Sequence, residues 1–268
     1  MGSIPDLTHQ LRTGDTVLFS SNTPTAFMLR TLTASFWNHS GIAIRVKPDG
    51  KISSDYEGKL YILETNLAIR YDAVFNEMVD GIGFSEATWV FSKYNCCAAR
   101  FLHDKFRNEQ FGVSTIEYVK SYRHAKFPSS LKPFAKVWIG ISFDDGGSGG
   151  SGEEGKEEKD KERQEAMFCS EFMASYYSHC LGEQYKRLTG NPFEGDLSVL
   201  FGVGSPQEPG LFSPESYSHL QTPNAPIYNG KEQMILVHQG DLLYVIVQPL
   251  IIVIFFMLLL MMGLPKFG

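Results

Sequence analysis

The first half of the chain alternates short apolar runs with turn signals, which is the pattern of β-strands. Strands are predicted over residues 16–19, 39–46, 61–64 and 87–91. Thr13-Gly14-Asp15 precedes the first strand and Pro48-Asp49-Gly50 closes the second, because Gly, Asp and Pro favour turns. The run Tyr61–Glu64 is the expected partner of the strand over 39–46.

Apolar residues at helical spacing predict helices elsewhere. The predicted helices cover residues 24–35, 96–106, 115–121 and 167–181, the last ending at Gly182. A glycine tolerates the left-handed conformation that often terminates a helix. The stretch from there to Tyr228 is rich in Pro, Gly and Ser and is predicted to be mostly loop. Strands first and helices afterwards, with hairpin signals, indicate an α+β fold.

One segment differs from all others in hydropathy. Residues Leu242–Leu264 carry no charge, and as a helix they would span roughly 34 Å, enough to cross a bilayer. Four residues follow this run, and residues 1–14 contain no apolar run that could serve as a signal peptide. We therefore expect a single-pass C-terminal transmembrane tail anchor in the endoplasmic reticulum or another endomembrane, with the rest of the chain cytosolic. A buried core helix is the alternative.

A second segment has no capacity to form a core. Between Asp144 and Ala166 no aromatic or aliphatic residue larger than alanine occurs, so the stretch cannot compensate its own ordering entropy. We expect a disordered insert, a Gly/Ser hinge followed by a charged stretch, with a regulatory insert as the alternative. Residues 1–143 and 167–230 are then expected to form a single domain.

Charge and cysteine content exclude two classes of protein. Lys and Arg number 24 against 30 Asp and Glu, giving a net charge of -6 and a pI near 5.7. No basic field exists that could gather phosphates, so nucleic-acid binding is not expected. The four cysteines include the neighbours Cys96 and Cys97, which cannot easily bridge each other. A disulfide framework is not expected, and a reducing compartment fits better.

Three residues form the strongest candidate for chemistry. Cys169 falls at the predicted start of a helix, where unpaired amides and the helix dipole favour thiolate, although a buried cysteine is often only a small hydrophobe. His39 opens a predicted strand, and Gly41 leaves room for a close approach. Glu64 ends the neighbouring strand, where its carboxylate could orient the imidazole. A core histidine and a surface carboxylate are the alternative interpretations.

Five motifs follow one another along the chain: Leu11–Phe19, Asn38–Ile42, Ile62–Thr65, Phe168–Phe172 and Leu211–Glu215. In this order they resemble the circularly permuted papain-like thiol hydrolases of the NlpC-type superfamily. The resemblance is to the YiiX-like amidases and their poxvirus relatives, with the lecithin retinol acyltransferases as distant kin. It implies a permuted papain-like antiparallel sheet with packed helices, a nucleophile at Cys169, a general base at His39 and an orienting carboxylate at Glu64.

The resemblance also frames the expected activity. It implies a cysteine hydrolase of the amidase, peptidase or esterase type that forms a thioester acyl-enzyme. The expected anchor would make this hydrolase membrane-bound, and proximity to the bilayer favours lipid acyl or lipid-linked amide bonds as its substrates. An acyltransferase of the lecithin retinol type and a catalytically silent, membrane-tethered interaction module are the alternatives. Two features depart from the family: the insert before Cys169 is long and charged, and the bacterial members lack the C-terminal anchor.

Other groupings are weaker. Cys169, Cys180, His179 and His103 could be sketched as a metal site, but no CxxC or HxxxH spacing supports it, so core packing is the better interpretation. No metal and no cofactor are expected. Arg30, Arg45 and Arg70 could hold an anionic headgroup, although scattered arginines usually decorate a solvated face.

Overall fold

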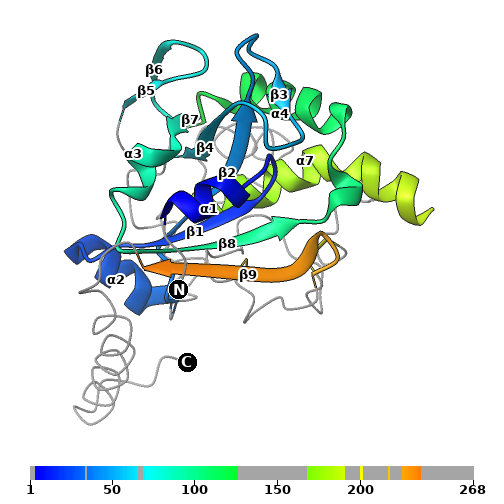
Figure 1. The fold of residues 1–268 in the computed structure, drawn as a ribbon. Helices are drawn as coiled ribbons and strands as arrows, with labels where there is room; N and C mark the ends of the chain where they lie inside the picture. The colour runs from blue at the N-terminus through cyan, green and yellow to red at the C-terminus, as the bar shows by residue number, and fades with distance from the viewer. Residues whose placement is uncertain are drawn as a thin grey trace, which may run out of the picture.

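The fold is built around one antiparallel sheet. The computed structural model describes residues 4–33, 35–65, 69–125, 168–190, 200–201, 217 and 225–236. The described residues form a seven-stranded sheet in the order β7-β4-β2-β1-β8-β9, with β3 paired to β2 (Figure 1). Its strands are β1 Thr16–Ser20, β2 His39–Val46, β3 Ile52–Ser53, β4 Lys59–Thr65, β7 Ile82–Glu86, β8 Cys96–Leu102 and β9 Tyr228–Leu236. A two-stranded sheet adds β5 Arg70–Asp72 and β6 Glu77–Val79.

The middle strands are buried throughout their length. Every residue of β1 and of β2 is buried, because helices cover both faces of the sheet. The predicted strands over 16–19 and 39–46 are confirmed, and β4 pairs with β2 as expected, with Ile42 opposite Leu63. Continuous apolar runs are what such doubly covered strands require.

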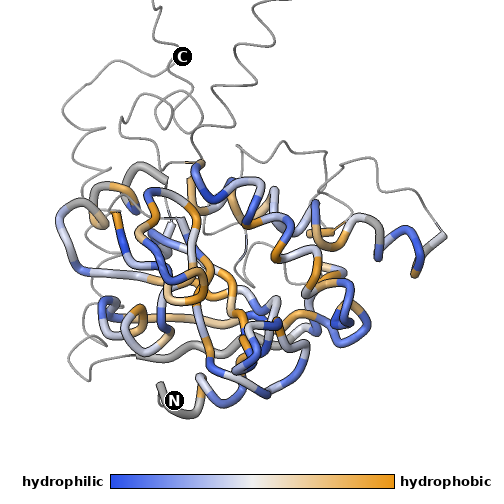
Figure 2. Tube along the Cα trace, turned by 90° about the horizontal axis from the view of Figure 1, so that it is seen from above, coloured by the Kyte–Doolittle hydropathy of each residue, from blue (hydrophilic) through white to orange (hydrophobic). Residues whose placement is uncertain are grey.

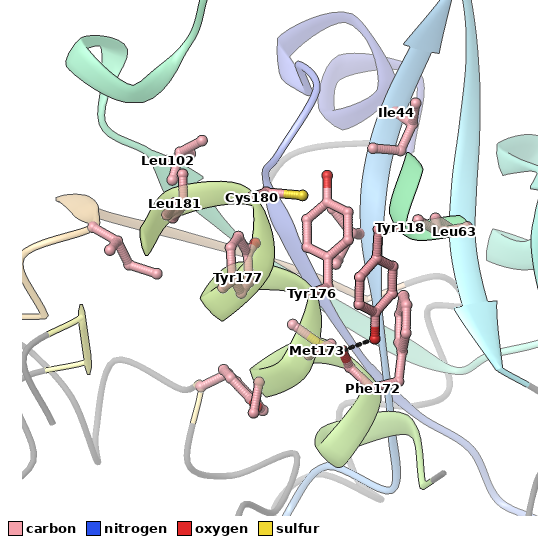
Figure 3. Packing of buried hydrophobic residues seen from close by; sticks show 14 of the residues in the cluster. Ile44, Leu63, Leu102, Tyr118, Phe172, Met173, Tyr176, Tyr177, Cys180 and Leu181 are labelled. Atoms are coloured by element: carbon pink, nitrogen blue, oxygen red, sulfur yellow. Dashed lines mark hydrogen bonds between the residues drawn. The ribbon is translucent and has the colours of Figure 1, made fainter. Parts of the chain in front are cut away.

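Two layers of helix enclose the sheet. The helices are α1 Ile4–Gln10, α2 Pro24–Thr33, α3 Ala87–Phe91, α4 Glu109–Tyr122 and α7 Cys169–Thr189, with a 3₁₀ turn, η1, at Asp104–Phe106. Side chains of α4 and α7 pack with Ile44, Leu63 and Leu102 in one core cluster (Figure 3). Side chains of α1 and α3 pack with Val17 and Phe19 in another, on the opposite face. Figure 2 shows hydrophobic segments concentrated inside this body and hydrophilic ones along its periphery.

Two predicted elements are wrong. Residues 87–91 form the helix α3 rather than a strand, with Ala87, Val90 and Phe91 buried at helical spacing. Residues 96–102 form the strand β8 rather than the start of a helix, pairing with β1 and β9. Cys96 faces one core cluster and Cys97 the other, so both sides of this strand are apolar and the alternation that marks a strand is lost.

The helix predicted over 167–181 is longer than expected. It begins at Cys169, continues past Gly182 and ends at Gly190, which has φ 76° in the left-handed region. Residues 183–189 are therefore helical, not loop. The helix predicted at 115–121 is part of α4, and the strand β9 and the helix α1 were not predicted from the pattern.

Several expectations fall outside the described residues. These are the insert at Asp144–Ala166, the motif at Leu211–Glu215 and the uncharged run at Leu242–Leu264. Among the helices that the structure describes, none combines the length and hydropathy that a membrane span needs.

Candidate active site

Three strands meet at one end of the sheet, which we call the site end. There β2 begins at His39, β4 ends at Thr65 and β7 begins at Ile82. On this end, Glu64 pairs with Gly83 of β7 and lies beside Gly41 of β2. A Cβ on Gly41 would lie 2.7 Å from Ile62 Cγ2 and 3.5 Å from the Cβ of Glu64. The close approach predicted at Gly41 is therefore present, since any larger residue would displace its neighbours.

The His39 imidazole bonds directly to the Glu64 carboxylate. Nε2 of His39 lies 2.7 Å from Oε2 of Glu64, and both residues are buried, with 8% and 1% of their surfaces exposed. Ser85 Oγ donates to Oε1 of Glu64 at 3.0 Å. The two carboxylate oxygens thus have separate partners, which fixes the plane of the carboxylate and the ring that it holds.

A buried arginine, Arg70, hydrogen-bonds to the backbone of Glu64 and of its partner strand. Nη2 of Arg70 donates to the backbone carbonyl of Glu64 and, at 3.1 Å, to that of Gly83. Burial by itself raises the pKa of Glu64, but the hydrogen bond and charge of His39, the charge of Arg70 and the Ser85 hydroxyl outweigh it and lower the pKa below its usual value. Glu64 is therefore an anion facing His39.

Cys169 reaches the other side of the imidazole from the first residue of α7. The hydrogen bond and charge of His39 act on its thiol, and Ser40, the residue after His39 in β2, also lowers its pKa. The Ser40 hydroxyl itself is buried and has no hydrogen-bond partner among the described residues. Because Nε2 of His39 is bonded to Glu64, the contact with Cys169 falls to Nδ1. The result is a continuous buried chain from Cys169 through His39 to Glu64.

The electrostatics of these three side chains favour a negative charge on Cys169 and a positive charge on His39. Burial opposes the charged form of each residue, raising the pKa of Cys169 and lowering that of His39. The hydrogen bonds and charges within the chain are stronger. They raise the pKa of His39 to about 10 and lower the pKa of Cys169 below its usual value. Both shifts favour a thiolate beside an imidazolium, the state in which a cysteine is nucleophilic.

The beginning of α7 is held by contacts on both sides of Cys169. The hydroxyl of Tyr217 donates to the carbonyl of Ser170 at 2.6 Å, and the Glu171 carboxylate accepts from the backbone N–H of Phe168 at 3.4 Å. The backbone N–H of Phe172 donates to the carbonyl of Phe168 at 2.8 Å. These contacts fix the first helical turn, and with it the position of the sulfur.

Two aromatic rings stack near the imidazole. The Tyr94 ring lies 5.7 Å from the His39 ring and is tilted by only 8° against it, and the Phe19 ring lies 5.8 Å from it at 30°. Tyr94 and Phe19 also stack on each other at 4.5 Å. Burial, together with the negative charges of Glu64 and Cys169, raises the pKa of Tyr94 well above its usual value. Tyr94 is therefore a neutral phenol beside the charged pair.

The structure brings together all three residues that the sequence singled out. It adds Ser40, Ser85, Arg70 and Tyr94, which sequence reasoning did not connect with the site. Ser40 carries a local signal, since it follows His39 directly. The others depend on strand pairing and on chain crossings that a pattern does not contain.

The interpretation of the three arginines as a solvated face is wrong. Arg30, Arg45 and Arg70 have 0%, 9% and 6% of their surfaces exposed. Arg45 donates to the carbonyls of Leu11 at 2.9 Å and Gly58 at 3.1 Å. The guanidinium of Arg45 therefore hydrogen-bonds to backbone carbonyls of this protein, and that of Arg70 hydrogen-bonds to the strands around Glu64.

The sketched metal site is not assembled. Cys180 lies in the core between α7 and α4, the His179 ring lies 5.5 Å from the Tyr118 ring, and Nδ1 of His103 accepts from the backbone N–H of Lys105. In the part of the chain that the structure describes, no three His, Cys, Asp or Glu side chains are grouped to hold a metal ion. All four cysteines are free and buried.

Comparison with solved structures gives a similarity of shape. No family model matches the chain, and no curated protein matches it. Among solved structures, the chain is similar to the crystal structure of metalloprotein yiiX from Escherichia coli O157:H7, at 15% sequence identity and a TM-score of 0.43, with 84% of this chain and 97% of that chain covered. The term metalloprotein describes that bacterial protein.

Proposed function

We propose that the protein is a thiol hydrolase of the permuted papain-like type. Cys169 is the nucleophile, His39 moves the proton and Glu64 holds the imidazole in place. The observation that carries the proposal is the buried chain from Cys169 through His39 to Glu64, in which each residue favours the reactive state of the next. A protein that had lost the chemistry would have no need to keep these three buried polar side chains together. Their arrangement therefore favours an enzyme over a catalytically silent interaction module.

The first half-reaction forms an acyl-enzyme. The Cys169 thiolate adds to the carbonyl carbon of the substrate, so that a C–S bond forms and the carbonyl electron pair moves to oxygen. The first N–H groups of a helix have no intrahelical partner and favour negative charge, so the beginning of α7 can stabilise the oxyanion. When the carbonyl re-forms, the C–N or C–O bond breaks, and the imidazolium of His39 gives its proton to the leaving amine or alkoxide.

The second half-reaction restores the enzyme. Neutral His39 takes a proton from water as the water oxygen adds to the thioester carbon. The C–S bond then breaks, the acid leaves and Cys169 returns as thiolate beside the imidazolium. If an alcohol or amine of a second substrate replaces water, the same steps transfer the acyl group, which is the acyltransferase alternative.

The membrane part of the proposal rests on the sequence. The uncharged run Leu242–Leu264 is long enough to anchor the chain in a bilayer, with the catalytic domain on the cytosolic side and endomembranes as the expected location. Lipid acyl esters and lipid-linked amides are concentrated there, so they are the proposed substrate class. A tether raises the effective concentration of membrane substrates without changing the chemical step.

Covalent labelling tests the chemistry directly. The full chain would be treated with an acyl-electrophile probe as wild type, Cys169→Ala and Cys180→Ala. Labelling is expected in wild type and in Cys180→Ala, and not in Cys169→Ala. Acyl-lipid and peptide-amide libraries, compared between wild type and Cys169→Ala, would then identify the substrate. Equal labelling of the wild type and Cys169→Ala would refute the assignment of the nucleophile.

A further inference from the structure

The chain leaves the sheet at the same end as the candidate active site. Leu236, the last residue of β9, pairs with Cys96 of β8, and Cys96 pairs with Ser20 of β1. One residue earlier in β1, Phe19 pairs with His39. The end of β9 is thus level with His39 and three strand spacings away, about 14 Å.

Little chain separates this exit from the uncharged run. Only residues 237–241 lie between Leu236 and Leu242, and the six Cα–Cα steps from Leu236 to Leu242 span at most about 21 Å. If the run enters a bilayer, the site end of the sheet must stay near that bilayer. With the run in a bilayer, the short connection would keep the site close to the membrane surface.

The surface of the site end suits such a position. Exposed apolar side chains follow two of its strands, at Phe27 on α2 after β1 and at Ile69 beyond the end of β4. Trp89 is exposed on α3, which leads from the far end of β7 back to the start of β8 at the site end. Trp89 is 45% exposed, and the Lys93 ammonium lies 3.1 Å from the centroid of its ring. The charges of Glu64 and Arg70 act on the pKa of Lys93, so Lys93 lies near the candidate site. A tryptophan beside a lysine is typical of the interface between lipid headgroups and acyl chains.

The opposite end of the sheet has a different surface. There Val46 ends β2 and Lys59 begins β4, opposite one another. The exposed ion pairs Lys47–Glu57, Lys51–Asp49 and Lys59–Glu86 decorate this end. Such pairs are typical of a solvated face, and none of these side chains suits the acyl region of a bilayer.

We propose that the site end of the sheet rests on the phospholipid bilayer that the uncharged run enters, with Trp89 and Lys93 at the interface. The inference rests on the proposed function for its meaning, because it implies that the scissile bond reaches Cys169 from the membrane. Its surface geometry can be tested without catalysis. The substrate class it favours is an acyl ester or amide located at the headgroup boundary.

Fluorescence quenching tests this orientation. The full chain would be reconstituted in phosphatidylcholine vesicles with and without brominated acyl chains. The emission of Trp89 is obtained by subtracting the emission of Trp89→Phe from that of the wild type. This subtraction removes the contributions of the other tryptophans. The matched control is the double variant Trp89→Phe/Tyr56→Trp, read against Trp89→Phe. Tyr56 is 52% exposed at the opposite end of the sheet, so the two positions have similar access to solvent.

The proposal expects brominated lipid to reduce the Trp89 emission by about twofold or more, as for a side chain at the interface, and to leave the Tyr56→Trp emission unchanged. Equal quenching at both positions would overturn it. So would an unquenched Trp89 in a vesicle-bound chain, the result expected if a protein partner covered this surface, and so would failure of the full chain to enter vesicles. Repeating the measurement in Cys169→Ala separates the orientation from the chemistry. The quenching of Trp89 in this variant should equal its quenching in the wild type, even if the proposed catalysis is wrong.

Discussion

Two cysteines of the same helix show what the site adds to simple burial. Cys169 begins α7 and Cys180 lies eleven residues further along it, and they have 6% and 2% of their surfaces exposed. Burial raises the pKa of Cys180 far above its usual value, and the hydrogen bonds from Thr115 and Tyr176 do not offset it. The pKa of Cys169 is lowered. Similar burial therefore leaves the thiol form favoured at Cys180, while the partners of Cys169 favour its thiolate.

The difference lies in the partners, not in the helix. Cys180 faces the aromatic core between α7 and α4, near Tyr176 and Tyr118 (Figure 3). Cys169 faces a histidine whose positive charge is maintained by Glu64, and the neighbouring Ser40 also lowers the pKa of Cys169. A buried thiolate persists only where a cation and hydrogen-bond donors replace the water it has lost. The comparison suggests experiments that change one partner at a time.

The largest expected effect is the selectivity of alkylation. In the folded protein at neutral pH, Cys169 should react with iodoacetamide roughly 100-fold faster than Cys180 or Cys97, because only the thiolate is nucleophilic. Cys96 should also be slower. His39→Ala should slow the reaction of Cys169 and leave Cys180 unchanged. Peptide mapping by mass spectrometry measures each rate, and equal rates at all four cysteines would contradict the thiolate assignment.

Removing the charge of Glu64 should have the next largest effect. In Glu64→Gln the imidazolium loses its anion, so the pKa of His39 falls and less thiolate forms at Cys169. Both the alkylation rate of Cys169 and any acyl turnover should fall by about 10- to 100-fold. Glu117→Gln is the matched control, because Glu117 acts on Cys180 and not on the site. An unchanged alkylation rate in Glu64→Gln would show that Glu64 does not maintain the imidazolium.

The charge pair should also appear in the pH dependence of stability. The raised pKa of His39 stabilises the fold fully below the unfolded value of about 6.5, and this contribution is lost as the pH rises through about 10. The lowered pKa of Cys169 stabilises the fold above the unfolded thiol value, and this contribution is lost as the pH falls through the folded value. The two trends cancel between the unfolded values and leave a plateau near neutral pH.

The alkaline limb is the measurable one. Above about pH 8.5 the unfolded chain releases the thiol proton, while the folded chain keeps a proton on His39 up to about pH 10. The difference in the free energy of unfolding between wild type and Cys169→Ala should therefore shrink by roughly 1 to 2 kcal/mol over this interval. Urea denaturation of both proteins at several pH values measures it. A difference independent of pH would argue against the ion pair.

The smallest effect concerns a single hydroxyl. Ser40→Ala removes a buried hydroxyl that helps to lower the pKa of Cys169 and keeps the backbone N–H, so the thiolate loses about 1 kcal/mol of stabilisation and alkylation slows about fivefold. Thr115→Val is the counterpart at Cys180, where the thiol is already neutral at pH 7. It should leave the rate at Cys169 unchanged. If Ser40→Ala reacts as fast as wild type, the backbone N–H and His39 suffice to hold the thiolate.

Local patterns sufficed for some elements and failed for others. The strands at 16–20 and 39–46 were predictable because turn residues bound them, and the helix start at Cys169 because a run of helical spacing follows it. Residues 87–91 were misassigned because five apolar-rich residues fit a strand as well as a short helix. Residues 96–102 were misassigned because a strand buried on both faces shows no alternation. The end of α7 was misplaced because tertiary packing carries the helix through Gly182.

The candidate residues Cys169, His39 and Glu64 could be named from the order of motifs along the chain. Their residue types and their places at the ends of elements are properties of the sequence by itself. Only the tertiary structure decided that Arg70 is buried beneath Glu64, that Tyr94 stacks on His39, and that the exit of β9 is level with the site. These contacts join residues that lie far apart in sequence or in separate elements. Local propensity acts over a few neighbouring residues, whereas strand order and register are set by packing the whole sheet against helices on both of its faces.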